Sequence, residues 1–180
     1  SKVEELEKRV RKVMEKLKKL LKDSEKESDD VARRLEELLE ESEREVREVL
    51  RELEDLLRKV DREEVKDAVR KLLERAKRSS DEVRKRIRDL IEESKRSSEE
   101  VKRLIDKLIK ELEDVIRKAA KDGRGDDVDE TIKRVEEEVK KVVDDNRRLN
   151  EEILRKVKKV IDDNRRLIEK VREDVDRMAK

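Results

Sequence analysis

The side chains that could do chemistry in this chain are carboxylates, ammonium and guanidinium groups, a few hydroxyls and three carboxamides. Charged residues make up 59% of it, with 54 Lys or Arg against 53 Asp or Glu, and it has no His, Cys, Pro or aromatic residue. Without thiols, imidazoles or aromatic rings, it cannot build a thiolate or imidazole nucleophile, a zinc or haem site, a disulfide framework or a base-stacking platform. The net charge of +1 gives no long-range attraction for nucleic acid. We therefore expect no enzyme activity, no cofactor, no metal site and no nucleic-acid partner.

Apart from Ser1 and Thr131, the uncharged polar residues are distributed differently from the charged ones, since they lie on or next to the apolar stripe. In the first third of the chain Ser24, Ser28 and Ser42 are separated by 4 and 14 residues. The asparagines of the last third have the same separations, and the serines of the middle third have them in reverse order, as an antiparallel segment requires. These residues are Asn146, Asn150 and Asn164, and Ser80, Ser94 and Ser98.

The mirrored spacing predicts which residues share a cross-section. Serines of the first and middle segments pair with a constant index sum of 122, which places the fold-back at Asp61: Ser24 with Ser98, Ser28 with Ser94, Ser42 with Ser80. An offset of 122 also takes each first-segment serine to an asparagine. We expect a larger buried polar zone of Ser24, Ser28, Ser94, Ser97, Ser98, Asn146 and Asn150, and a smaller one of Ser42, Ser79, Ser80 and Asn164.

A buried zone of this kind would act through hydrogen bonds. A Ser hydroxyl donates or accepts, and an Asn amide does both, so three helices can satisfy one another across the bundle axis. An unpaired buried polar group costs about 1 to 3 kcal/mol. We expect a slipped register or an altered helix order to leave several such groups unpaired, so the zones would specify one fold.

The elements that position these residues follow from the apolar spacing of three and four residues, which is typical of amphipathic helices. The pattern slips near Asp61, where Asp61 with Glu64 predicts a helix cap, and again near Gly123, where Asp127 with Glu130 predicts another. Ser1 with Glu4 has the same signature. We predict one all-α domain over 1–180, with helices at about 2–60, 62–121 and 127–180. Short connections make it a long, nearly straight, coiled-coil-like three-helix up-down-up bundle.

Three alternative interpretations concern local signals. Four serines have a Glu three residues later and could instead begin helices, which would give six or seven short helices: Ser24, Ser42, Ser79 and Ser97. The acidic residues around Gly123 lack the ligand spacing of a calcium loop. Arg124, Gly125 and Asp126 spell the integrin-recognition tripeptide, but Gly and Asp are also the residues that a turn needs.

The repeated blocks Val143–Leu149 (VDDNRRL) and Ile161–Leu167 (IDDNRRL), the Ser-Ser steps at 79/80 and 97/98, and the Asp-Gly loop at 122/123 carry a resemblance that covers the whole chain. The chain resembles computationally designed helical bundles with built-in hydrogen-bond networks. The resemblance implies a scaffold or assembly component without a natural ligand. The resemblance also implies that Asn146 and Asn164 belong to a hydrogen-bond network of this kind.

These expectations combine into a functional hypothesis. The chain is a thermostable de novo designed scaffold, without natural biochemical activity, whose fold specificity is set by buried Ser and Asn layers. The alternative is a designed interaction module, a subunit or cage with a groove that accepts another helix. No apolar run exceeds two or three residues, so we expect no membrane partner and a soluble chain that stays cytosolic when expressed. A monomer that requires no partner is favoured, and a helical oligomer is the alternative.

Overall fold

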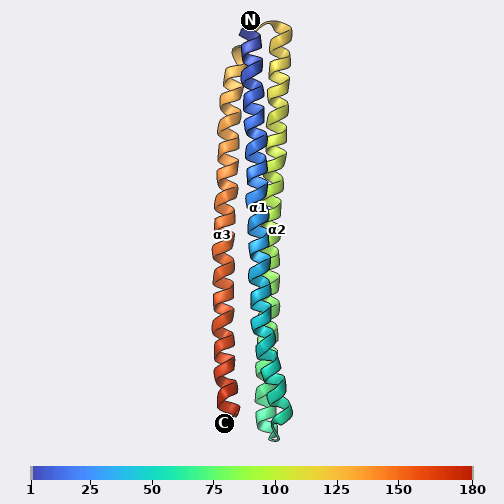
Figure 1. Cartoon of the computed structure of the whole chain (residues 1–180), viewed down its shortest axis with the longest axis vertical. Coiled ribbons are helices and arrows are strands. Elements are labelled where there is room, and N and C mark those ends of the chain that lie inside the picture. The colour runs from blue at the N-terminus through green and yellow to red at the C-terminus, as the bar shows by residue number, and fades with distance from the viewer. Residues whose placement is uncertain (1, 180) are drawn as a thin grey trace. The chain divides into compact units, whose positions relative to one another are not determined.

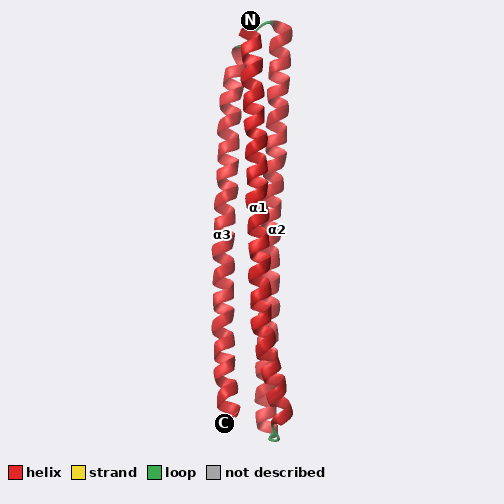
Figure 2. Ribbon diagram, viewed as in Figure 1, coloured by secondary structure: helices red, strands yellow, loops and turns green. Residues whose placement is uncertain are grey.

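The computed structural model describes residues 2–179, which form three helices and no strand (Figures 1 and 2). They are α1 (Lys2–Lys59), α2 (Glu63–Asp122) and α3 (Asp126–Ala179). The helices pack against one another, which confirms the predicted all-α three-helix bundle. α1 continues through Ser24 and Ser42, and α2 through Ser79 and Ser97, so the interpretation as six or seven short helices is wrong.

The helices end within one residue of their predicted bounds. The residues that flank α2 and α3 lie one or two positions away from the predicted caps. Lys66 N–H donates to the carbonyl oxygen of Arg62 at 3.0 Å, so Arg62, and not Asp61, flanks the first turn of α2. α3 already begins at Asp126, which places Asp127 inside the helix and makes Gly125 the flanking residue. The predicted cap at Ser1 lies outside the described residues.

The connection between α2 and α3 depends on glycine. Gly123 has a φ of +67°, and its N–H donates to the carbonyl oxygen of Ala119 at 2.8 Å, the left-handed ending of a helix that glycine adopts without strain. Gly125 is needed for a different reason, because a Cβ atom there would overlap Cδ1 of Leu6. Acidic residues in the first turn of α3 complement the helix dipole: Asp126, Asp127 and Asp129.

The chain divides into two compact units, and each contains parts of α1, α2 and α3. The first unit holds the described residues up to Val31 together with Glu93–Glu151. Its core includes Leu17, Ile105 and Val139, which are at most 1% exposed. The second unit holds Ala32–Glu92 and the described residues from Glu152 onwards. Its core includes fully buried residues from each helix, namely Val49, Leu53, Val69, Ala76 and Val171.

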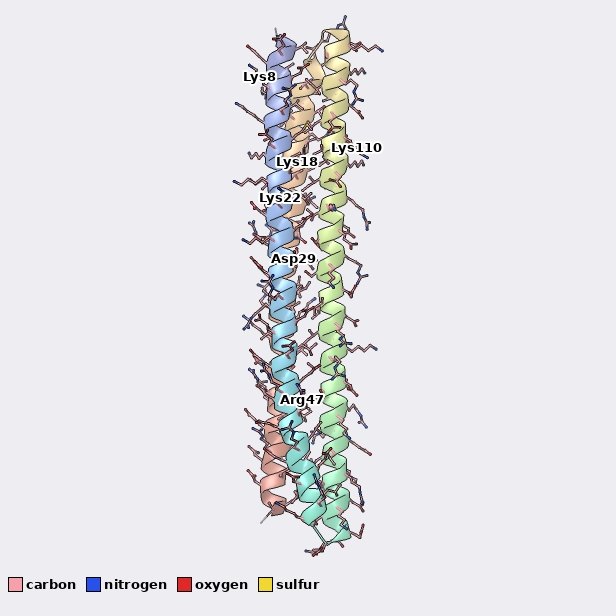
Figure 3. All side chains as sticks on the ribbon, turned by 45° about the vertical axis from the view of Figure 1, so that its right-hand side comes forward. Lys8, Lys18, Lys22, Asp29, Arg47 and Lys110 are labelled. Carbon is pink, nitrogen blue, oxygen red and sulfur yellow. The ribbon has the colours of Figure 1, made fainter. Side chains whose placement is uncertain are left out.

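Charged side chains cover the outside of the helices. The labelled Lys8, Lys18, Asp29 and Lys110 in Figure 3 are all exposed. Within residues 2–179 no large hydrophobic side chain is exposed, because each helix turns its apolar stripe inward. The same residues include no helix with an apolar stretch that could cross a bilayer.

Candidate functional site

The polar side chains buried within the described part of the chain are serines and asparagines, each between 1% and 5% exposed. They are Ser24, Ser28, Ser42, Ser94, Asn146, Asn150 and Asn164. Helical spacing brings them inward, because each occupies a position in the apolar stripe of its own helix. Two further serines that bond to them, Ser79 and Ser97, are half-buried.

Asn146 is the centre of the first polar layer, in the first unit. Its Nδ2 donates to Oγ of Ser24 and to Oγ of Ser28, both at 3.3 Å. Its Oδ1 accepts from Oγ of Ser97 at 2.7 Å. One amide therefore joins α1 to α2 and uses both of its N–H groups and its carbonyl oxygen.

Asn150 makes a second layer one helical turn further along α3. Its Nδ2 donates to Ser28 Oγ at 3.3 Å, and its Oδ1 accepts from Ser94 Oγ at 2.7 Å. Ser28 accepts from two amides and thereby links the two layers.

Asn164 makes the third layer, in the second unit. Its Nδ2 donates to Ser42 Oγ at 3.4 Å, and its Oδ1 accepts from Ser79 Oγ at 2.5 Å. The direction of bonding is the same as in the first unit: serines of α1 accept from the amide nitrogen, and serines of α2 donate to the amide oxygen.

The pairing of α1 with α3 that the sequence predicts is confirmed in each unit. Hydrogen bonds join Ser24 to Asn146, Ser28 to Asn150 and Ser42 to Asn164, all at the offset of 122. Of the predicted pairings between α1 and α2, only that of Ser28 with Ser94 shares an asparagine.

The other two predicted pairings are wrong by one residue, because Ser97 and Ser79 take the places expected for Ser98 and Ser80. Neighbouring residues on a helix point about 100° apart, so only one serine of each adjacent pair can face the amide. Ser80 instead lines a groove between α1 and α2 beside Glu43 and Arg84. Ser80 and Ser98 are half-buried and make no side-chain hydrogen bond with any residue that the structure describes.

Ion pairs between α1 and α3 lie beside the polar layers, and sequence reasoning missed them. Arg147 Nη2 lies 3.4 Å from Glu27 Oε1, and Arg165 Nε lies 3.2 Å from Glu45 Oε2. The hydrogen bond that Arg165 donates to Glu45 raises the pKa of Arg165. Glu27 and Glu45 are also two of the glutamates that suggested helix caps at Ser24 and Ser42. An exposed ion pair of this kind contributes at most about 1 kcal/mol to stability.

The layers and ion pairs recur at 18 residues, which is five helical turns and so returns to the same helix face. Ser24, Glu27 and Asn146 thus correspond to Ser42, Glu45 and Asn164. The Asn150 layer has no polar counterpart, because Ser28, Ser94 and Asn150 correspond to Val46, Ala76 and Ile168, all buried in the core of the second unit. The chain therefore contains a polar and an apolar version of one layer.

The chemistry available in these layers is hydrogen bonding. A serine becomes a nucleophile when a nearby base accepts its proton, but Ser79, Ser94 and Ser97 each donate to a neutral amide oxygen, which is too weak a base. No cluster of three or more acidic side chains able to hold a metal ion occurs in residues 2–179.

No family model, no curated protein and no solved structure matches the chain. The interpretation of these layers therefore rests on their geometry.

Proposed function

We propose that this chain is a designed structural scaffold without natural biochemical activity, in which the Ser and Asn layers restrict the helices to one packing arrangement. The observation that carries the proposal is that the buried polar side chains of the described residues bond to one another across helices. A scaffold needs such groups only for specificity, since apolar residues would fill the same positions with equal or greater stability.

The physical basis is the cost of misplaced polar groups. A slip of α3 by one turn moves each asparagine by about 5.4 Å along the axis. Asn164 and one of Asn146 and Asn150 then lose their serines, while the other of these two enters the neighbouring polar layer. Each group left unpaired costs about 1 to 3 kcal/mol, and the slip unpairs several together. The three-residue connections restrain large slips, so the layers act on small slips and on the order of the helices around the axis.

Distance measurement between spin labels tests this proposal. The chain has no native cysteine, so labels attach only at introduced ones. Cysteines at the exposed positions Asp29 and Glu151 would report the α1–α3 spacing within the first unit. We expect one narrow distance distribution for this pair.

The comparison variant carries the same labels but replaces the network asparagines by Leu and their bonded serines by Ala. We expect it to remain helical, to melt at a higher temperature and to give a broad or divided distribution. A label pair within α1, at Lys22 and Asp29, is the control and should be unchanged. An equally narrow distribution in both proteins would contradict the proposed role of the layers.

An interaction module is the second candidate, and a groove in the first unit favours it. The groove has a volume of about 430 Å³ and lies between α1 and α3, where Val13, Leu17, Leu20 and Val143 line it together with charged residues. Light scattering during size-exclusion chromatography separates the two candidates. The scaffold proposal predicts a mass near 21.7 kDa, and a stable dimer would favour the interaction module.

A further inference from the structure

The hydrogen bonds of the polar layers all involve α3. Every hydrogen bond that joins the layers within residues 2–179 has an α3 asparagine on one side and a serine of α1 or α2 on the other. The serines of α1 and α2 do not bond to each other in these layers. Removal of α3 would therefore unpair all of these serines together: Ser24, Ser28, Ser42, Ser79, Ser94 and Ser97.

The serines define the chemistry of the helix that can replace α3. In each layer α1 offers a hydroxyl that accepts and α2 offers one that donates, within the reach of a single side chain. A primary amide on a short stem fits, because it has both N–H donors and a carbonyl acceptor. An aspartate would bring a charge and no N–H, and a leucine would bond to neither hydroxyl.

We infer that within each unit α1 and α2 form a recognition site for the asparagines of an α3 helix: Asn146 and Asn150 in the first unit, and Asn164 in the second. The partner is the α3 segment of a second copy of this chain. The ion pair of Arg147 with Glu27 supplies charge complementarity between α1 and α3 in the first unit, and that of Arg165 with Glu45 does so in the second. This inference rests on the proposed function, because it gives the same layers the task of selecting a partner helix.

The connection at Gly123–Gly125 normally keeps the site occupied by the chain's own α3. A short tether gives the attached segment an effective concentration in the millimolar range, which a free segment at micromolar concentration cannot match. Exchange of α3 between copies is therefore measurable only after this connection is cut.

The experiment uses the full chain with a site-specific protease sequence inserted after Gly123 and cut after folding. An isotope-labelled α3 segment, purified from a second preparation, is added in equal amount. The mixture is unfolded in guanidinium and refolded to reach equilibrium, and native mass spectrometry measures the labelled fraction of the complex. We expect the cut protein to stay associated at 10 µM and about half of it to hold the labelled segment.

The decisive competitor exchanges two neighbouring residues, Leu149→Asn with Asn150→Leu, and so keeps the composition of the segment. It leaves Ser94 without its acceptor, which by the cost of an unpaired group predicts roughly tenfold weaker competition. We expect about one tenth of the complex to hold it. The matched control exchanges exposed charges, Glu151→Lys with Lys158→Glu, and should compete like the unmodified segment.

Two results would overturn the inference: separation of the cut halves at 10 µM, or equal uptake of the swapped and unmodified segments. Either failure is distinguishable from failure of the proposed function. If the intact chain still gives a narrow spin-label distribution and the apolar variant a broad one, the layers specify the fold but do not select a helix in trans. If the intact chain also gives a broad distribution, both proposals fail.

Discussion

The carboxamide of Asn164 shows what a single residue contributes to this molecule. It is 4% exposed, donates to Ser42 and accepts from Ser79. Both bonds require a neutral group with a donor and an acceptor on one short side chain. The site therefore discriminates between side chains of nearly identical shape.

The substitution Asn164→Asp tests this discrimination. Burial raises the pKa of the introduced carboxyl above its unfolded value of about 3.9, so the folded state holds the proton more tightly. The variant should match the parent in free energy of unfolding below about pH 4 and lose stability as the pH rises through the folded pKa. At pH 8 we expect a deficit of about 2 to 4 kcal/mol.

Denaturant melts of variant and parent across this pH range measure that deficit, with the exposed neighbour substitution Asp163→Asn as control. A deficit that did not change with pH would show that position 164 is open to water in the folded chain.

Replacing either glycine by alanine should destabilise the fold, for a different reason at each position. Gly123→Ala places a Cβ in the left-handed region and should cost about 1 kcal/mol. Gly125→Ala forces Leu6 to move and should cost about 1 to 3 kcal/mol. In a Leu6→Ala background the cost at Gly125 should largely disappear, whereas the cost at Gly123 should persist. A double-mutant cycle by thermal melts checks this, and equal coupling of both glycines to Leu6 would be the contrary outcome.

At the scale of the helix, the 18-residue recurrence supplies an internal reference for the energy of a polar layer. The triple variant Ser28→Val, Ser94→Ala, Asn150→Ile rebuilds the Asn150 layer as its apolar counterpart in the second unit. Ser28→Val also removes one of the two acceptors of Asn146 Nδ2, which keeps Ser24, just as Asn164 has Ser42 alone. Because satisfied polar networks are often no more stable than apolar packing, we expect the free energy of unfolding to stay the same or to rise by up to about 3 kcal/mol.

The single variant Asn150→Ile should instead lose about 1 to 3 kcal/mol, because it leaves the Ser94 hydroxyl without its acceptor. Urea unfolding compares the two. Greater stability of the single variant than of the triple variant would contradict the network energetics.

The sequence predicts the helices and the α1–α3 pairing well, because both depend on periodicity within long segments. The apolar stripe fixes which face of α3 turns inward, and the separations of 4 and 14 align Ser28 with Asn150. It does not distinguish Ser97 from Ser98, since that choice depends on the side of α2 that α3 occupies, and apolar spacing is the same for either side. The caps at Asp61 and Asp127 were misplaced because the observed flanking residues are Arg62 and Gly125, and neither has a side chain that accepts a hydrogen bond and so signals a cap.

At the scale of the whole molecule, ionisation is confined to the surface. The buried polar residues of the described chain are uncharged serines and asparagines. Arg84, Arg134 and Arg165 donate hydrogen bonds to Glu43, Glu111 and Glu45 respectively, and these bonds raise the pKa values of the three arginines. An arginine whose pKa is raised in the folded state stabilises the fold at every pH below its unfolded pKa. This contribution is lost only at strongly alkaline pH.

The free energy of unfolding should therefore vary by less than about 1 kcal/mol between pH 6 and pH 9. Chemical denaturation at pH 6, 7.5 and 9 in 0.15 M salt measures it. A change of several kcal/mol would mean that a titratable group is buried in the fold.

The side-chain amides themselves give the most direct test of the central claim, that asparagines and serines of different helices meet in layers away from water. The chain has three asparagines and no glutamine, so a proton–nitrogen NMR spectrum contains three NH₂ pairs. We expect three separate pairs that exchange slowly with water, with a nuclear Overhauser contact from the Asn150 amide to the Hβ protons of Ser28. Three overlapping pairs at the position of a free amide, in fast exchange with water, would contradict the account.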